Sequence, residues 1–342
     1  MKRIVLCFDG TWNTPADDAI PEEERVETNV RRFFQSVPLT AADGTVQDPW
    51  YNEGVGTGRL NRELGGAFGV GLDQHIVDGY RHLVDTYEDG DEVYVLGFSR
   101  GAYTARSLVG MIRNCGLVRP KFAALRVPMA FGIYRTRQDG PDSSVARGFR
   151  SAFGREIRVR FLGLWDTVGA LGIPGPFLDR VDAALYQFHD TRLSSIVDRA
   201  YHALALDEHR SDYAATLWDE AAAPGQVFEQ RWFAGAHSDV GGGYPDRRLS
   251  DLSLRWMQDR AAEAGLELKP VGVRPDGFAG PPTDSYALFL GGKFARLVPR
   301  HFRPVFATTA GNEVLDPSVE RRRGDAGLAY RPGNPGLPAA VV

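Results

Sequence analysis

Residues 93–104 read VYVLGFSRGAYT and carry the strongest structural signal in the chain. The apolar run 93–98 predicts a buried strand, and a helical pattern follows it. Between them lies the pattern Gly-x-Ser-x-Gly, in which Gly97 and Gly101 lack the side chains that would clash in a tight turn. In such a turn the serine takes a strained backbone conformation and exposes its hydroxyl above the sheet. The pattern therefore predicts Ser99 as a nucleophile, although a glycine-rich turn capped by a serine would look the same.

Short apolar runs alternate with helical patterns on both sides of this segment. Further strands are expected at 4–8, 45–51, 157–165 and 227–234, and helices at 29–36, 72–87, 101–115 and 201–210. Such alternation predicts an α/β protein with a mainly parallel central sheet and helices on both faces.

The chain is expected to form one domain with two interruptions, over residues 1–315. The stretches 118–156 and 172–198 break the alternation and are interpreted as insertions above the sheet, where lids and substrate-shaping segments are common. Packed surface helices are the alternative interpretation. Residues 316–342 are rich in Pro, Gly and Arg and are expected to form an extended C-terminal tail.

A serine nucleophile needs a neighbouring base, and histidine is the usual one. His237 lies in the loop 235–244 (GAHSDVGGGY), directly after the predicted strand 227–234. An open α/β sheet places its site at the carboxyl ends of its strands, so His237 is the predicted base. His202 is the next candidate, and His301 also stays open.

The base needs a carboxylate to orient it. Asp166 follows the predicted strand 157–165 and therefore lies at a carboxyl end, as Ser99 and His237 do. The chain order Ser, Asp, His is that of the α/β-hydrolases, which predicts an α/β-hydrolase-like fold. Asp239 is the rival acid, although it is only two residues from the histidine; Asp166 would then cap the turn that follows it.

Acyl transfer also needs two donors directed at the developing oxyanion. The backbone amide of Arg100, directly after the nucleophile, is the first expected donor. The second is expected in the loop after the first strand, from an amide of Gly10 or Thr11. Asp9 is expected to hold this loop by accepting hydrogen bonds.

The segment 7–11 (CFDGT) also invites a different interpretation. Phosphatases of the haloacid dehalogenase type have Asp-x-Asp-Gly-Thr after their first strand, with the first aspartate as nucleophile. Cys7 stands at that position here, so aspartyl-phosphate chemistry lacks its attacking group and is rejected. A metal site built from Asp9 and Asp239 stays open as an alternative, while the main interpretation needs neither a metal nor a cofactor.

Composition excludes several classes of protein. The 342 residues are 43% hydrophobic and 25% charged, as in globular proteins rather than disordered or fibrous ones. The net charge of −4 gives no support to a nucleic-acid partner. Two cysteines, Cys7 and Cys115, provide neither a disulfide framework nor zinc-ligand spacing. We find no signal peptide and no membrane-spanning run, which predicts a cytoplasmic protein, with signal-independent export left open.

Four segments resemble, in this order, a widespread α/β-hydrolase family whose better-known members are bacterial type VI secretion phospholipase effectors. They are 6–13 (LCFDGTWN), 97–103 (GFSRGAY), 161–168 (FLGLWDTV) and 232–244 (WFAGAHSDVGGGY). The resemblance covers roughly residues 1–244. It implies a catalytic triad of Ser99, Asp166 and His237, the same three residues that the spacing argument selects.

These features together predict a serine hydrolase that cleaves carboxylic esters through an acyl-enzyme. By resemblance, a lipid or another small acyl ester is the expected substrate, and peripheral contact with a membrane is compatible with it. A non-catalytic module that retains the hydrolase fold and binds a ligand or partner is the alternative. Such a module has no need of all three triad residues, which favours the enzyme.

Overall fold

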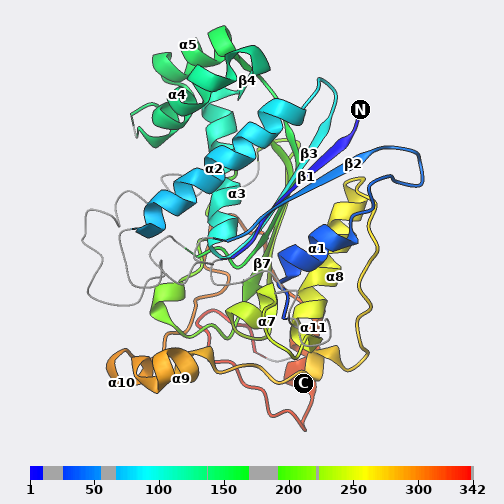
Figure 1. The fold of residues 1–342 in the computed structure, drawn as a ribbon. Helices are drawn as coiled ribbons and strands as arrows, with labels where there is room; N and C mark the ends of the chain where they lie inside the picture. Colours follow the sequence, from blue (N-terminus) through cyan, green and yellow to red (C-terminus); the bar gives the residue numbers. More distant parts are fainter. Residues whose placement is uncertain (11–25, 55–66, 137, 169–191, 221–222, 340–342) are drawn as a thin grey trace.

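The computed structural model describes residues 1–10, 26–54, 67–136, 138–168, 192–220 and 223–339. A seven-stranded sheet lies at its centre, with the strands in the order β2-β1-β3-β6-β7-β8-β9 (Figure 1). Their bounds are β1 (Arg3–Phe8), β2 (Gln47–Asn52), β3 (Glu92–Phe98), β6 (Val159–Trp165), β7 (Val197–Ala205), β8 (Val227–Phe233) and β9 (Glu313–Leu315). All neighbouring strands in this sheet are parallel. The predicted parallel sheet is therefore confirmed.

Helices cover both faces of the sheet. Side chains alternate along β1, so that Ile4 and Leu6 pack into one apolar layer and Val5 into the other. The first layer lies under α2 (Ala67–Thr86) and α3 (Arg100–Cys115), and the second under α1 (Asn29–Ser36) and α8 (Arg248–Glu263). A parallel sheet between two helical layers, with a serine at a strand-to-helix turn, makes this fold α/β-hydrolase-like.

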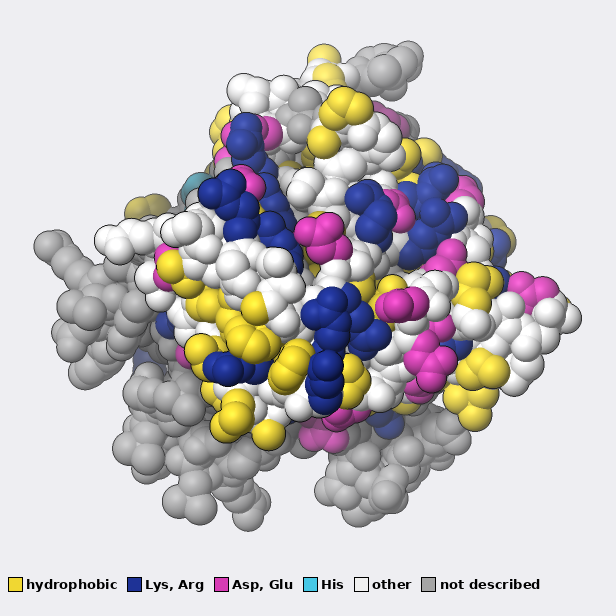
Figure 2. Space-filling view, turned by 90° about the horizontal axis from the view of Figure 1, so that it is seen from above, with side chains coloured by type: hydrophobic (Ala, Val, Ile, Leu, Met, Phe, Trp, Pro, Cys, Tyr) yellow, Lys and Arg dark blue, Asp and Glu magenta, His cyan; other side chains and the backbone are white. Residues whose placement is uncertain are grey.

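The first predicted insertion, residues 118–156, is mostly helical. It contains η3 (Pro120–Phe122), α4 (Ala123–Arg135) and α5 (Ser144–Phe153), with an antiparallel ribbon of β4 (Leu117–Val118) and β5 (Gly154–Arg155) at its base. Helix α4 packs on α2 and α3 and leaves Leu125 and Met129 exposed. Figure 2 looks down on the α4–α5 end of the molecule and shows hydrophobic side chains beside Lys and Arg. The function of this segment as a lid stays a prediction.

The predicted helix over residues 201–210 is wrong, because residues 201–205 form the last part of strand β7 and residues 206–210 form a turn and a loop. Strand β7 lies between β6 and β8, and His202 is fully buried in it. A strand covered on both faces is apolar throughout instead of alternating. Its alanines and leucines are also strong helix formers. Composition alone therefore favoured the wrong element.

Short helices lie in the segments that follow β7, β8 and α8. They are η4 (Ser211–Tyr213), α7 (His237–Gly241), η5 (Gly277–Ala279), α9 (Ser285–Leu288), η6 (Phe289–Gly292) and α10 (Phe294–Leu297). In Figure 1, α7, α9 and α10 lie at the end of the molecule toward which β1 runs from the N-terminus. None of the helices in the described ranges has the length and apolar character that crossing a bilayer requires.

The C-terminal region differs from the extended tail predicted for residues 316–342. It begins with helix α11 (Pro317–Gly324), in which Asp316 caps the first turn and Pro317 occupies the first helical position. Val319 and Arg322 are buried against the rest of the chain, so this region packs onto the domain. Of the second predicted insertion, 172–198, residues 172–191 lie outside the described residues, and its last two residues already belong to β7.

Candidate active site

Ser99 lies at the turn between β3 and α3. Its φ of 57° is in the left-handed region, which residues with side chains seldom adopt. Two glycines permit this turn: a Cβ on Gly97 would lie 2.4 Å from the Gly101 carbonyl oxygen, and one on Gly101 would lie 2.1 Å from the Phe8 carbonyl oxygen. Helix α3 begins directly after Ser99, so its N-terminal amides lie beside the hydroxyl. Ser99 is 7% exposed, which is less open than the sequence suggested.

Asp166 follows β6 and has a φ of 39°. Its amide donates to the Ala203 carbonyl oxygen over 2.7 Å, and the Ser99 amide donates to the Trp165 carbonyl oxygen over 3.0 Å. These bonds hold the serine and the aspartate at the ends of the neighbouring strands β3 and β6. In the described part of the chain, four non-glycine residues have positive φ, and Ser99 and Asp166 are two of them. Such concentration of backbone strain is typical of a functional site.

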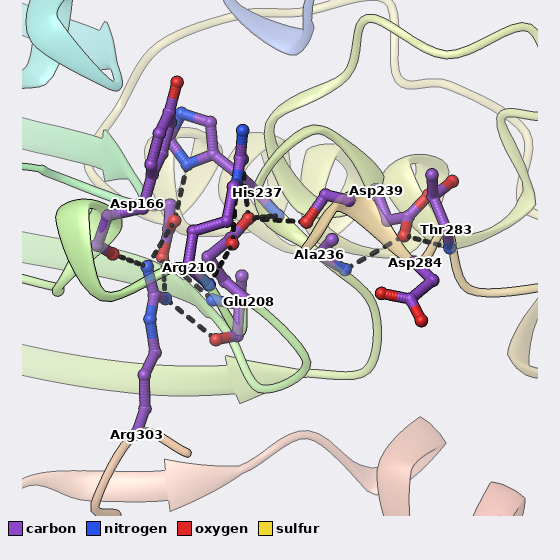
Figure 3. Close-up of polar contacts among 12 residues, drawn as sticks. Asp166, Glu208, Arg210, Ala236, His237, Asp239, Thr283, Asp284 and Arg303 are labelled. Carbon is purple, nitrogen blue, oxygen red and sulfur yellow. Dashed lines mark hydrogen bonds and ion pairs between the residues drawn. The ribbon is translucent and has the colours of Figure 1, made fainter. Parts of the chain in front are cut away.

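His237 is the first residue of α7 and lies fewer than five residues after β8. Its Nδ1 lies 2.6 Å from Oδ2 of Asp166 (Figure 3). The imidazole packs on Phe98, the residue before Ser99, with ring centroids 4.6 Å apart. Because Nδ1 donates its proton to the carboxylate, Nε2 is left as the basic nitrogen. The loop after β8 thus brings an oriented imidazole to the serine turn.

The surrounding charges decide how this pair is protonated. Burial by itself raises the pKa of Asp166, but the Arg303 guanidinium and the bond to His237 outweigh burial and hold that pKa well below its usual range. Burial lowers the pKa of His237, and Asp166 opposes this only in part. At neutral pH Asp166 is therefore a carboxylate and His237 a neutral imidazole, as a general base must be.

Arg303 belongs to this site, although the sequence analysis did not select it. Its guanidinium donates to Oδ1 of Asp166 over 2.6 Å and to Oδ2 over 3.0 Å. It also donates to the carbonyl oxygens of Ala205, over 2.8 Å, and of Tyr213. Arg303 is 137 residues from Asp166 along the chain. The surrounding residues 300–304 (RHFRP) carry no motif that would have distinguished it from a surface arginine.

Glu208 is another buried carboxylate near His237, and the sequence analysis missed it. It accepts two bonds from the Arg210 guanidinium, from Nε over 2.8 Å and from Nη2 over 2.7 Å. The backbone amide of His237 donates to it over 3.3 Å, and the Ser285 hydroxyl over 3.0 Å. The Arg210 guanidinium lies 3.5 Å above the Tyr213 ring, which meets the His237 ring edge-on at 5.2 Å. Glu208 therefore ties the start of α7 to the start of α9.

Asp239, the rival acid, is bonded elsewhere. Its Oδ2 accepts the amides of Ala236, over 2.9 Å, and of Thr283, over 2.8 Å, and its Oδ1 accepts the Thr283 hydroxyl over 3.0 Å. Figure 3 shows Asp166 between Arg303 and His237, whereas Asp239 points toward Thr283. Asp239 caps α7 and fastens it to the segment before α9, while Asp166 is the carboxylate bonded to the imidazole.

Two of the three candidate oxyanion donors, the amides of Gly10 and Arg100, belong to the described residues. The Gly10 amide donates to Oδ1 of Asp9 over 2.6 Å, and Oδ2 of Asp9 accepts the hydroxyls of Thr28 and Tyr51 over 2.7 and 2.5 Å. Asp9 thereby holds the end of β1. Thr11 lies outside the described residues. Arg100 is the first residue of α3, so its amide is adjacent to Ser99.

The other candidate histidines bond to the backbone. Nε2 of His202 accepts the amide of Thr167 over 3.0 Å, and burial lowers the pKa of His202 to about 3. His202 therefore stays neutral and supports the backbone next to Asp166. The backbone of His301 contacts His209: its amide donates to the His209 carbonyl oxygen over 2.9 Å, and its carbonyl oxygen lies 2.9 Å from Nδ1 of His209.

The alternative interpretation of Asp9 and Asp239 is a metal site. Across the described ranges, no group of three or more His, Cys, Asp and Glu side chains is arranged to hold a metal ion. Asp9 and Asp239 instead accept bonds from hydroxyl and amide donors of the chain. Burial also raises the pKa of the Cys7 thiol, which keeps it protonated.

Comparison with known proteins identifies related sequences. Residues 2–260 match the profile of the type VI secretion system family described as phospholipase effector Tle1-like, catalytic domain. An uncharacterized protein of Saccharomyces cerevisiae is 31% identical over 236 residues, which are 62% of this chain and 32% of the yeast protein. The chain thus spans a minor part of that relative's length.

Several solved structures are also similar. An uncharacterized protein from Pseudomonas aeruginosa is 19% identical, with 81% of this chain and 48% of that chain covered and a TM-score of 0.45. The Tle1 effector bound to the VgrG spike of the type 6 secretion system is 20% identical, with coverage of 71% and 51% and a TM-score of 0.39. Esterase 2 of Thermogutta terrifontis is 15% identical, with coverage of 79% and 85% and a TM-score of 0.40.

Proposed function

The chain belongs to the family of Tle1-like phospholipase effector catalytic domains, and we propose that it is a serine hydrolase that cleaves carboxylic esters through an acyl-enzyme. The observation that carries this proposal is the 2.6 Å bond from His237 to Asp166, with the imidazole packed beside the Ser99 turn. Family membership supports ester hydrolysis, and the arrangement of these three residues supports the serine mechanism.

In the proposed mechanism, Nε2 of His237 takes the Ser99 proton while the serine oxygen attacks the ester carbonyl carbon. Asp166 stabilises the imidazolium that forms. His237 then gives the proton to the departing alcohol, and the ester C–O bond breaks to leave an acyl-enzyme. A water molecule, deprotonated by His237, attacks this acyl group and releases the acid and the free serine.

The negative charge on the carbonyl oxygen needs two donors, each worth about 3–4 kcal/mol. We assign the first to the Arg100 amide, at the positive end of the α3 dipole. The second comes from the loop after β1, through the amide of Thr11 or Gly10. The Gly10 amide already donates to Asp9, so it would have to leave that carboxylate in order to act. Thr11 is therefore the favoured second donor.

A lipid ester is the proposed substrate class, and the surface formed by residues 285–300 supports it. We call this the α9–α10 surface. Leu288 and Leu297 are 68% and 84% exposed there, and residues 285–300 include Lys293 and Arg296 but no acidic residue. The segment is joined to the site, because Phe289 packs on Tyr213 at 6.0 Å and Tyr213 packs on His237. Exposed leucines in a segment that also carries cations and no acidic residue suit a peripheral contact with anionic lipid.

Hydrolysis of defined esters tests this function. Purified wild-type protein and the Ser99→Ala variant would be assayed on p-nitrophenyl esters of increasing acyl length and on phospholipids of known head group. We expect the wild type to release acid and alcohol from at least one of them, and Ser99→Ala to lose this activity by several orders of magnitude. A folded wild-type protein that cleaves none of them would favour the non-catalytic binding module.

A further inference from the structure

The Arg303 guanidinium clamps the carboxylate that orients the imidazole. It donates one bond to each oxygen of Asp166, and Oδ2 of Asp166 also receives the bond from His237. Paired bonds between a guanidinium and a carboxylate set direction as well as charge. Arg303 and Asp166 are 2% and 0% exposed, so water screens this pair only weakly. The clamp therefore acts on the same oxygen that holds the imidazole.

Hydrogen bonds of both its side chain and its backbone hold Arg303 in position. Its side chain donates to the carbonyl oxygen of Ala205, at the end of β7, and to that of Tyr213. Its own carbonyl oxygen accepts Nδ2 of Asn334 over 2.9 Å, and the same amide group donates to the Leu206 carbonyl oxygen over 3.0 Å. Arg303 and Asn334 both lie beyond residue 260, where the match to the family profile ends.

We propose that Arg303 is a positioning residue of the acid–base pair: supplied by the C-terminal region, it holds the Asp166 carboxylate in the orientation that accepts Nδ1–H of His237 and leaves Nε2 of His237 unprotonated at neutral pH. The inference rests on the proposed function for its catalytic meaning. The hydrogen bonds that join Arg303 to Asp166 and Asp166 to His237 do not depend on the proposed function.

The electrostatic reasoning starts from a lone buried carboxylate. Without Arg303, the negative charge of Asp166 would be balanced most readily by a proton on His237, because an opposite charge stabilises an imidazolium. With Arg303 in place, the guanidinium already neutralises the carboxylate. A positive charge on the imidazole is then stabilised less by Asp166. Removal of Arg303 should therefore raise the pKa of His237 and shift activity toward higher pH.

Other ionisable groups also lie near the pair. Glu208 and Arg210 neutralise each other through two bonds on the side of the His237 backbone. On the β7 side, His202 stays neutral because burial lowers its pKa to about 3, with the Arg106 charge adding to this effect. Within the described ranges, Arg303 is the cation that hydrogen-bonds to Asp166.

The test compares Arg303→Met and Arg303→Lys with the control Arg322→Met. Arg322 is 4% exposed and donates to the carbonyl oxygens of Phe278 and Gly280, so this control removes a buried guanidinium from the same region without touching Asp166. Two readouts would be recorded for each variant, kcat/KM against pH on a soluble ester and the ring pKa of His237 by NMR of histidine-labelled protein. Thermal melting would verify folding.

We expect Arg303→Met to move the acid limb and the His237 pKa upward together by about one unit or more. Arg303→Lys should lower kcat with little change in KM and move the pKa less, since it keeps the charge but loses the paired geometry. Arg322→Met should leave both pH readouts in place. A folded Arg303→Met protein with an unshifted His237 pKa would overturn the inference.

If Arg303→Met does not fold, Arg303→Lys serves as the test. A kcat and a His237 titration that both stay at their wild-type values in Arg303→Lys would overturn the positioning role. Because the NMR titration needs no turnover, it separates the two proposals. A wild-type protein without esterase activity but with an Arg303-dependent His237 pKa would contradict the proposed function and support the coupling.

Discussion

Ser99 and Asp166 hold backbone conformations that cost on the order of 1–3 kcal/mol each. Such strain persists only where the surroundings enforce it. At Ser99 the enforcing groups are the close-packed Gly97 and Gly101, and at Asp166 they are the Arg303 clamp and the Ala205 amide, which donates to Oδ1 over 3.0 Å. Both residues lie at the ends of neighbouring strands, and Asp166 holds the His237 imidazole beside this turn without a substrate.

Asp166→Asn should lower kcat by about 10⁴-fold, because an amide neither holds the required imidazole tautomer nor stabilises the imidazolium. Asp239→Asn is the matched control. Its bonds to Ala236 and Thr283 serve the capping of α7, so we expect mainly a lower melting temperature and a much smaller loss of kcat. Steady-state kinetics on one soluble ester would measure both. The reverse order of effects would assign the acid to Asp239.

The pH dependence of the wild type follows from His237. Burial lowers the pKa of His237, and in the proposed mechanism only the neutral imidazole can accept the Ser99 proton. Activity should therefore persist below the ordinary histidine pKa of about 6.5 and fall as pH drops further through the lowered value. A profile of kcat/KM against pH would locate this acid limb. A midpoint clearly above 6.5 would show that His237 is charged more readily than its buried setting implies.

At the scale of elements, the turn from β3 to α3 requires the backbone at Gly101 to lie close to Phe8, at the end of β1. The strand-to-helix turn was predictable because its glycine spacing is local in the sequence. Strand β7 was not, because burial on both faces removes the alternation that distinguishes a strand from an alanine-rich helix. Local patterns therefore revealed the serine turn but missed the central strand that supports Asp166 through Ala203 and Ala205.

Gly101→Ala should disrupt the serine turn. The added Cβ would lie 2.1 Å from the Phe8 carbonyl oxygen, so either α3 or the end of β1 must shift. We expect loss of ester hydrolysis and a lower melting temperature. Gly148→Ala in α5 is the control, because its Cβ would meet nothing within 4 Å and alanine favours a helix by about 0.5–1 kcal/mol. A fully active Gly101→Ala protein would mean that the turn tolerates a side chain.

At the scale of the whole molecule, the site combines segments from most of the chain. The three residues predicted for the triad follow β3, β6 and β8. Parallel strands end at the same edge of a sheet, so the sequence alone could place these residues at one edge. Arg303 contacts Asp166 from the C-terminal region. No local sequence pattern indicates this contact. Long-range contacts of this kind, including that of Ser285 with Glu208, require the folded structure.

The α9–α10 surface can be tested separately from the chemistry. The double variant Leu288→Gln and Leu297→Gln should bind and hydrolyse anionic phospholipid vesicles several-fold less well, with a smaller effect on a soluble short-chain ester. Leu125→Gln on α4 is the control, since Leu125 is 75% exposed but belongs to another surface. Vesicle sedimentation and product release would be measured together. If Leu125→Gln lowers vesicle binding and hydrolysis as much as the double variant does, lipid contact is not specific to the α9–α10 surface. If the double variant binds and hydrolyses vesicles as the wild type does, this surface does not contact lipid.

The most direct test of the account is the site of reaction with a fluorophosphonate, which modifies an activated serine. Peptide mass spectrometry of the labelled wild type should locate a single adduct on Ser99. We predict that Ser99→Ala abolishes labelling and that His237→Asn slows it by orders of magnitude while the protein remains folded. Labelling that persists in Ser99→Ala, or that proceeds at the wild-type rate in His237→Asn, would contradict the assignment of nucleophile and base.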